Sequence, residues 1–92
     1  MDYTVLRPPL TPTYELPTRN DLLRLKTGDL AKVTFQVGDD EAERMWVILE
    51  NCSTTDKWTG KIDSDARQTS TAKVLPAGKL VEFHPLDIIA IE

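Results

Sequence analysis

Strict alternation of apolar and other side chains is the feature that most constrains this fold. In residues 43–50, ERMWVILE, the side chains of Met45, Val47 and Leu49 point to one face of an extended chain and their neighbours to the other. Residues 31–37 alternate in the same way. A period of two predicts antiparallel strands, each with one face in the core.

The outer face of the 43–50 strand is unusual, because it carries Trp46 and Ile48 where a one-sided sheet is normally polar. Full burial of such side chains would stabilise the fold by about 2–3 kcal/mol each, so we expect this Trp46/Ile48 strip to be covered. The cover is another protein, or the chain's own N-terminal arm from the same or a second copy. The predicted partner-binding residues are Trp46, Ile48, Arg44, Lys61, Gln36 and Thr34.

Matching core positions to core positions also predicts the registers of two hairpins. The pairs expected in the first are Val37–Met45, Phe35–Val47 and Val33–Leu49, with Lys32 opposite Glu50 on the outer face. The pairs expected in the second are Leu49–Trp58, Val47–Gly60 and Met45–Ile62, with Trp46–Lys61 and Arg44–Asp63 on the outer face. Trp58 is then a core residue beside Gly60, which leaves room for a bulky neighbour.

Residues 1–18 are expected to form a proline-rich arm, and residues 19–92 a single small β-barrel domain. The arm holds four of the six prolines, so it is neither a central strand nor a helix interior, and polyproline-II-like structure is expected. It also carries apolar side chains such as Tyr3 and Val5, which predict that part of it packs against something.

The rest of the chain predicts short elements. Residues 20–25 suit one helical turn capped by Thr18 or Asn20. Further strands are expected at 58–63, 80–83 and 88–92, a long loop or weak edge strand at 64–74, and a tight or 3₁₀ turn at 84–87. The predicted fold is mainly β: a five-stranded, SH3-like antiparallel barrel with a 3₁₀ turn before the last strand. An OB-fold is the alternative, but it needs a helix that residues 64–74, without an apolar stripe, do not predict.

Composition excludes several function classes. The chain has 92 residues, 11 basic against 15 acidic, and a net charge of −4, which argues against nonspecific nucleic-acid binding. Its apolar runs are too short for a membrane span, and no signal peptide is evident, so a cytoplasmic location is expected. The single cysteine, Cys52, is interpreted as a bystander thiol.

No catalytic or metal-binding set is evident, so we expect no enzyme, no cofactor and no metal. The single histidine, His84, precedes Pro85 and is interpreted as a turn-capping or surface residue. Asp63-Ser64-Asp65 opens like a calcium loop, but Gln68 stands at the glycine position and Val74 at that of the bidentate glutamate. A hydrolase or metal enzyme built on His84 and these aspartates is therefore the least favoured class.

Several of these segments resemble a bacterial and phage family of small domains of unknown function. The matching motifs are E-R-M-W-V at 43–47, G-D-L-A-K-V-T-F at 28–35, G-K-I at 60–62, and a closing segment from Gly78 through Phe83 to Pro85, Ile88 and Ile91. The resemblance spans roughly residues 25–92 and implies an SH3-like barrel without an assigned activity. The chain departs from the family at 63–67, where members carry Asn-Asp/Glu-Pro, and the arm lies outside the match.

The leading hypothesis is a non-enzymatic protein-interaction module that binds through the Trp46/Ile48 strip. One alternative is an acidic, phage-type inhibitor of a host protein, with Asp39, Asp40, Glu41 and Glu43 as its acidic loop. A second alternative is a nucleic-acid-binding barrel, with stacking and phosphate contacts from Trp46, Lys32, Lys61 and Arg44.

Overall fold

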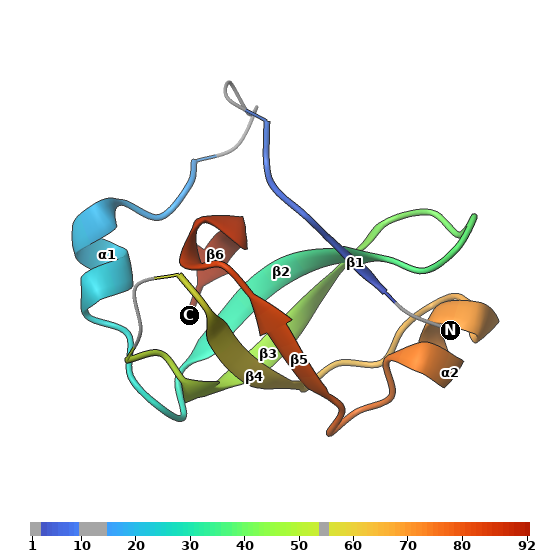
Figure 1. Cartoon of the computed structure of the whole chain (residues 1–92). Coiled ribbons are helices and arrows are strands. Elements are labelled where there is room, and N and C mark those ends of the chain that lie inside the picture. Colours follow the sequence, from blue (N-terminus) through green and yellow to red (C-terminus); the bar gives the residue numbers. More distant parts are fainter. Residues whose placement is uncertain (1–2, 10–14, 54–55) are drawn as a thin grey trace.

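A computed structural model describes residues 3–9, 15–53 and 56–92, and the described chain is mainly β (Figure 1). Its elements in chain order are β1 (Thr4–Leu6), α1 (Arg19–Leu23), β2 (Leu30–Gln36), β3 (Glu43–Asn51), β4 (Trp58–Ile62), α2 (Thr69–Val74), β5 (Leu80–Phe83), the 3₁₀ turn η1 (Pro85–Asp87) and β6 (Ile88–Ile91). The 3₁₀ turn before the last strand is confirmed.

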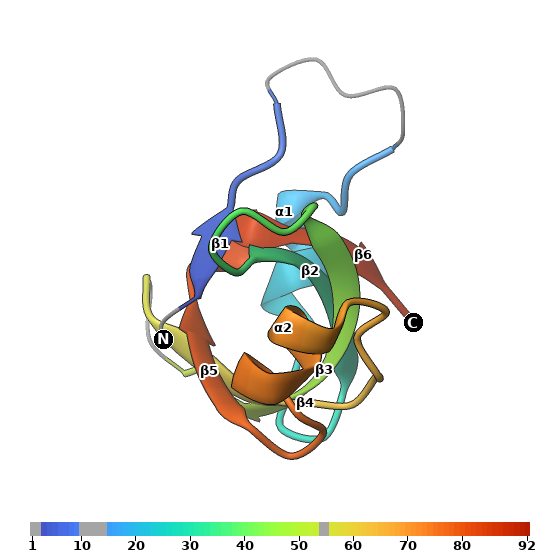
Figure 2. The ribbon, with the colours of Figure 1, turned by 90° about the vertical axis from the view of Figure 1, so that its right-hand side faces the viewer.

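The strands curl into a half-barrel. Strands β2 to β5 pair consecutively and antiparallel, and β6 returns to pair with β2, which gives a five-strand sheet. β1 pairs with the same edge of β2 as β6 does, but further along the strand: β6 covers residues 31–33 and β1 covers residues 34–36. Figure 2 looks into the curled sheet, and Figure 1 places α1 and α2 at opposite ends of it.

The alternating pattern explains the core. On β2 and β3 every second side chain is buried and those between are half-buried or exposed, as predicted. Trp58 is also buried as predicted, with 6% of its surface exposed. The buried apolar residues are Ala31, Val33, Phe35, Val37, Met45, Val47, Leu49, Trp58, Ile62, Leu75, Val81, Phe83, Ile88 and Ile89.

The predicted register of the β2–β3 hairpin is wrong by four residues. Val33 lies opposite Met45, where Leu49 was expected, and Lys32 lies opposite Trp46, where Glu50 was expected. Hydrophobic alternation fixes which face is buried, but a slip of two or four residues keeps every side chain on its face. The connection between the strands decides the offset, and here the chain turns at Gly38, with Asp40 N donating to Val37 O at 3.0 Å.

The predicted β3–β4 register is wrong by two residues. Gly60 lies opposite Leu49, where Val47 was expected, and a β-bulge follows between Leu49 and Asn51. Lys61 therefore lies beside Ile48, not over Trp46. The expected register of Arg44 with Asp63 is also wrong, since Asp63 lies beside Trp46 and its amide donates to Trp46 O at 2.8 Å.

The interpretation of residues 64–74 as a loop or weak edge strand is wrong, because 69–74 form the helix α2. Tertiary contacts favour this helix although its sequence, TSTAKV, has little intrinsic helix propensity. Thr71 and the following Leu75 are buried, and the Thr71 hydroxyl donates to Asp40 Oδ2 at 2.8 Å. Only Thr71 of α2 is fully buried, with Val74 packing partly against the core, and these two residues produce no apolar stripe that the sequence pattern could reveal.

The expectation that part of the arm packs against the domain is confirmed. β1 pairs with Thr34–Gln36 of β2, and the Tyr3 ring meets Phe35 edge to face at 5.8 Å. Residues 4–6 of the arm form a β-strand in the sheet and not a polyproline-II segment. Residues 10–14 of the predicted arm lie outside the described residues.

Candidate functional site

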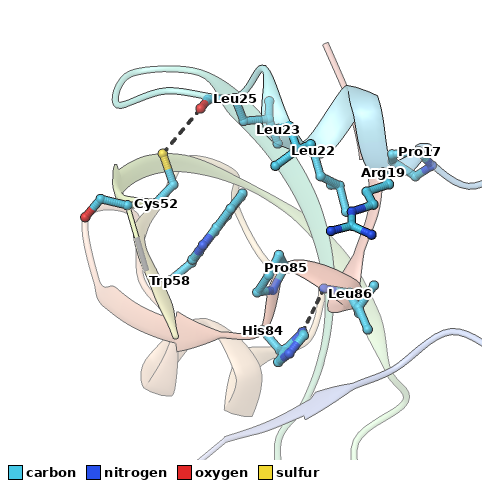
Figure 3. A pocket seen from close by; sticks show the side chains of 11 residues that line it. Pro17, Arg19, Leu22, Leu23, Leu25, Cys52, Trp58, His84, Pro85 and Leu86 are labelled. Carbon is cyan, nitrogen blue, oxygen red and sulfur yellow. Dashed lines mark hydrogen bonds between the residues drawn. The ribbon is translucent and has the colours of Figure 1, made fainter. Parts of the chain in front are cut away.

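An apolar groove of about 620 Å³ opens between α1 and η1 (Figure 3). One wall comes from α1 and its flanks, the other from η1 and the preceding His84, and the floor from the start of β4 and the residues that follow β3. The lining residues are Pro17, Arg19, Leu22, Leu23, Leu25, Cys52, Ser53, Trp58, His84, Pro85 and Leu86.

A capping box fixes the start of α1. Thr18, one of the two predicted caps, is the N-cap, and its hydroxyl accepts from Asp21 N at 3.1 Å while Asp21 Oδ2 accepts from Thr18 N at 2.9 Å. The hydrogen bonds from the Thr18 amide and hydroxyl lower the pKa of Asp21. Leu22 packs against the core, whereas Leu23 is 72% exposed and borders the groove.

The opposite wall is held by His84 and Asp87. His84 Nδ1 accepts from Leu86 N at 3.0 Å, and Asp87 Oδ2 accepts from His84 N at 2.9 Å. The interpretation of His84 as a turn-capping residue is thus confirmed. The turn buries Pro85 and leaves Leu86 56% exposed at the groove.

The floor combines the buried ring of Trp58 with the half-buried Cys52. The Cys52 thiol donates to Leu25 O at 3.6 Å. Burial, and then the charge of Asp29, raise the pKa of this thiol, so near neutral pH it is a weakly polar floor group and not a reactive thiolate.

Arg19 is the only permanently charged residue among the described residues that line the groove. Among these described lining residues there is no carboxylate. A surface of leucine, proline and tryptophan side chains with one cation at its rim suits an apolar segment that carries a negative charge. Sequence reasoning missed this groove, because its walls are two short elements 60 residues apart in the chain, and only the adjacent apolar pairs Leu22-Leu23 and Pro85-Leu86 hint at it.

The predicted Trp46/Ile48 strip lies elsewhere, on the outer face of β3. Trp46 and Ile48 are half-buried, and Lys32 Nζ lies 4.9 Å from the centre of the Trp46 ring. The neighbouring Lys61 pairs with Glu50 at 3.0 Å. Lysine side chains therefore cover part of the strip, and the described part of the arm pairs with β2 instead.

Of the remaining predicted strip residues, Arg44 shares the outer face of β3 with Trp46, whereas Thr34 and Gln36 lie on β2. Arg44 is exposed on β3, and Thr34 lies opposite it on β2. Gln36 Nε2 donates to Asp40 O at 3.1 Å, which directs this side chain toward the β2–β3 connection. The structure thus leaves Trp46, Ile48, Arg44 and Lys61 together on β3 and β4.

The predicted acidic loop is largely used inside the domain. Glu43 Oε1 accepts from Arg67 N at 2.7 Å, and Asp40 Oδ2 accepts from the Thr71 hydroxyl. Two backbone groups of Glu41 bond the side-chain amide of Gln68. Asp39 and the Glu41 side chain remain exposed.

No family model, curated protein or solved structure matches the chain. Within the three described ranges, no helix is long and apolar enough to cross a membrane. No three His, Cys, Asp or Glu side chains of the described residues gather into a metal-binding group.

Proposed function

We propose that the chain is a non-enzymatic protein-interaction module whose groove binds an apolar segment of a partner protein. The observation that carries this proposal is the pair of leucines, Leu23 and Leu86, exposed on opposite walls above Trp58. Large apolar side chains left exposed around a concave surface are typical of a recognition site.

Charge selects the occupant. The rim offers Arg19, and the lining residues that the structure describes include no carboxylate, so the segment carries an aspartate or glutamate beside its apolar residues. The chain as a whole has a net charge of −4, which disfavours a long acidic tract. The expected ligand therefore has two large apolar side chains and one carboxylate.

We further propose that the half-barrel is SH3-like. The strand order β6–β2–β3–β4–β5 and the 3₁₀ turn before β6 support this assignment. α2 supplies a helix that weakens the sequence argument against an OB-fold. However, β2 to β5 pair consecutively, as a meander, whereas the OB-fold is a Greek-key barrel.

The Trp46/Ile48 strip is a second candidate face of the same module. An aromatic ring and an isoleucine on an outer sheet face support it, and the cover from Lys32 weakens it. The acidic-inhibitor alternative loses support, because Asp40 and Glu43 are engaged with α2 and the residues before it. The nucleic-acid alternative loses support from the Lys61–Glu50 pair.

Selection from displayed random twelve-residue peptides tests the groove. We expect enriched peptides with two large apolar residues and one Asp or Glu, and about tenfold weaker binding to Leu23→Ser, since burial of a leucine contributes about 1.5–3 kcal/mol. Arg19→Gln should weaken the same peptides. Leu80→Ser is the matched control, because Leu80 is also exposed but does not line the groove.

Two results would contradict this assignment. Peptides that bind Leu23→Ser and the wild type equally would place the site outside the groove. If those peptides were lost on Trp46→Ala in a chain that still melts cooperatively, the Trp46/Ile48 strip would be the binding face.

A further inference from the structure

The first described residues of the chain occupy a built receptor site on the half-barrel. Residues 3–7 consist of the aromatic Tyr3, the strand β1 and the cationic Arg7, and each of these three parts contacts a group of the half-barrel. The matching groups are the free edge of β2 at 34–36, the Phe35 ring, the Glu82 amide and the Asp87 carboxylate. The site thus resembles a peptide-binding site filled by the chain's own segment.

Backbone pairing sets the position of the segment. Thr4, Val5 and Leu6 lie opposite Gln36, Phe35 and Thr34. Val5 also packs against the core from this edge. An exposed strand edge accepts any extended segment by main-chain hydrogen bonds, so specificity must come from the side chains at its ends.

Tyr3 supplies the first end. Its ring packs on Phe35, and its hydroxyl accepts from Glu82 N at 3.0 Å. β5 stands at one end of the strand order, so the backbone amide of Glu82 lies on an edge of the sheet. The Tyr3 hydroxyl accepts from this amide and thereby links β5 to β1. Figure 2 shows β1 and β5 as neighbours where the curled sheet comes back toward itself.

Arg7 supplies the second end. Its Nε lies 3.0 Å from Asp87 Oδ1, while Oδ2 of the same carboxylate accepts from His84 N. Asp87 is only 7% exposed, so its charge needs a partner. An unpaired buried carboxylate is strongly unfavourable, which makes the cation at this position selective.

None of these contacts requires the segment to belong to the same chain. All of its partners lie at least 27 positions further along, and residues 8–18 connect the segment to α1. In the described part of this tether, residues 8–9 and 15–17 make no hydrogen bond, whereas Thr18 at its end caps α1. Fully extended, its 11 residues reach about 36 Å, so it is long enough to lead to a second half-barrel.

We propose that this receptor site accepts residues 3–7 of a second copy in place of the chain's own, giving a strand-exchanged dimer. The exchanged dimer repeats every contact of the monomer, with Tyr3 and Arg7 contributed by the partner copy. The tether gives the chain's own segment an effective concentration of about 1 mM. The monomer therefore dominates at micromolar protein, and exchange begins as the protein concentration approaches 1 mM.

Disulfide trapping between two full-length variants tests the exchange. One carries Thr4→Cys and the other Gln36→Cys, positions that lie opposite in the ladder, and both carry Cys52→Ser. Under a redox buffer at about 1 mM protein, we expect the 4–36 heterodimer to exceed a 4–73 control, made with the exposed Lys73→Cys, by about tenfold. Adding Tyr3→Ala and Arg7→Ala to the Thr4→Cys chain should abolish the excess.

A 4–36 heterodimer no more abundant than the 4–73 control would overturn the proposal, as would an excess unaffected by Tyr3→Ala and Arg7→Ala. Sedimentation equilibrium of the wild-type chain gives a test without substitutions. We expect a reversible monomer–dimer equilibrium near 1 mM, and a strict monomer at several millimolar would also overturn it. Peptide binding in the groove plays no part in either measurement, so the two proposals stand or fall separately.

Discussion

At the scale of single residues, Gly60 shows how little space separates β3 from its neighbour. A Cβ added there would lie 2.9 Å from Ile48 O and 3.4 Å from Val47. The first atom belongs to the backbone, so a larger side chain can be accommodated only if β3 and β4 move apart. The pairing of two core strands thus requires glycine at this position.

Gly60→Ala should lower the free energy of unfolding by about 1–3 kcal/mol, because an added methyl in a filled site forces the backbone to shift. Urea denaturation measures the change. Thr59→Ala is the control, since Thr59 points to the half-buried outer face, and it should cost less than Gly60→Ala. An equal loss of unfolding free energy in both variants would show that β3 and β4 move apart at Gly60 without extra cost, and would contradict the requirement for glycine.

Cys52 gives a residue-scale prediction about pH. Because burial and Asp29 raise its thiol pKa, the folded chain should react with a thiol reagent more slowly than the urea-unfolded chain at pH 8, and its rate should rise at higher pH. The neutral thiol is the form that the fold favours. Stability from this group is therefore present below the ordinary thiol pKa and is lost as the pH rises through the raised one.

The rates at which Cys52 reacts with the thiol reagent, measured between pH 7 and pH 10.5 for the folded and the unfolded chain, test the raised pKa. Coinciding pH profiles would contradict a raised pKa. A groove ligand should slow the labelling of the folded chain further, because Cys52 lies in the groove floor.

At the scale of elements, α2 is held by a strand distant in sequence. Its N-cap residue, Gln68, makes no side-chain capping bond, and the Glu43 carboxylate accepts instead from the amides of Arg67 and Gln68. A negative charge at a helix N-terminus is favourable, and here it also ties the helix to β3. The start of β3 and the start of α2 are thus one structural unit.

Glu43→Gln should lower stability by about 1 kcal/mol, because it replaces charge-assisted hydrogen bonds by neutral ones. Hydrogen exchange of the amides at 67–74 should accelerate more than that of the β2–β3 ladder. Glu41→Gln removes the same charge nearby, but the Glu41 side chain is exposed and only its backbone groups bond Gln68, so its effect should be smaller. Equal acceleration in both variants would refute the capping role of Glu43.

Elements also show what could be predicted from the sequence and what could not. Alternation identified the buried faces of β2 and β3, and capping chemistry gave Thr18 or Asn20 as the N-cap of α1, of which Thr18 is the one used. The strand offsets could not be predicted, because a slip of two or four residues leaves the pattern unchanged. α2 and the groove could not be predicted either, since both depend on contacts between segments distant in sequence.

At the scale of the whole molecule, η1 connects two surfaces. His84 and Leu86 border the groove, while Asp87 holds Arg7 of the N-terminal segment. Within the described chain, β2 has a similar joining role, because it pairs with β1, β3 and β6. β2 and η1 are therefore the two elements that connect the other parts of the described chain.

The pairing of β6 with β2 sets an order of events during synthesis. β2 is synthesised early and β6 is the last strand of this unit to be synthesised. The edge of β2 at 31–33 therefore stays unpaired until all residues between the two strands have been translated. A nascent chain halted before Ile88 can form the β2–β5 meander but must leave that edge open. A stop codon just before Ile88 should therefore yield a chain that associates through the open edge of β2.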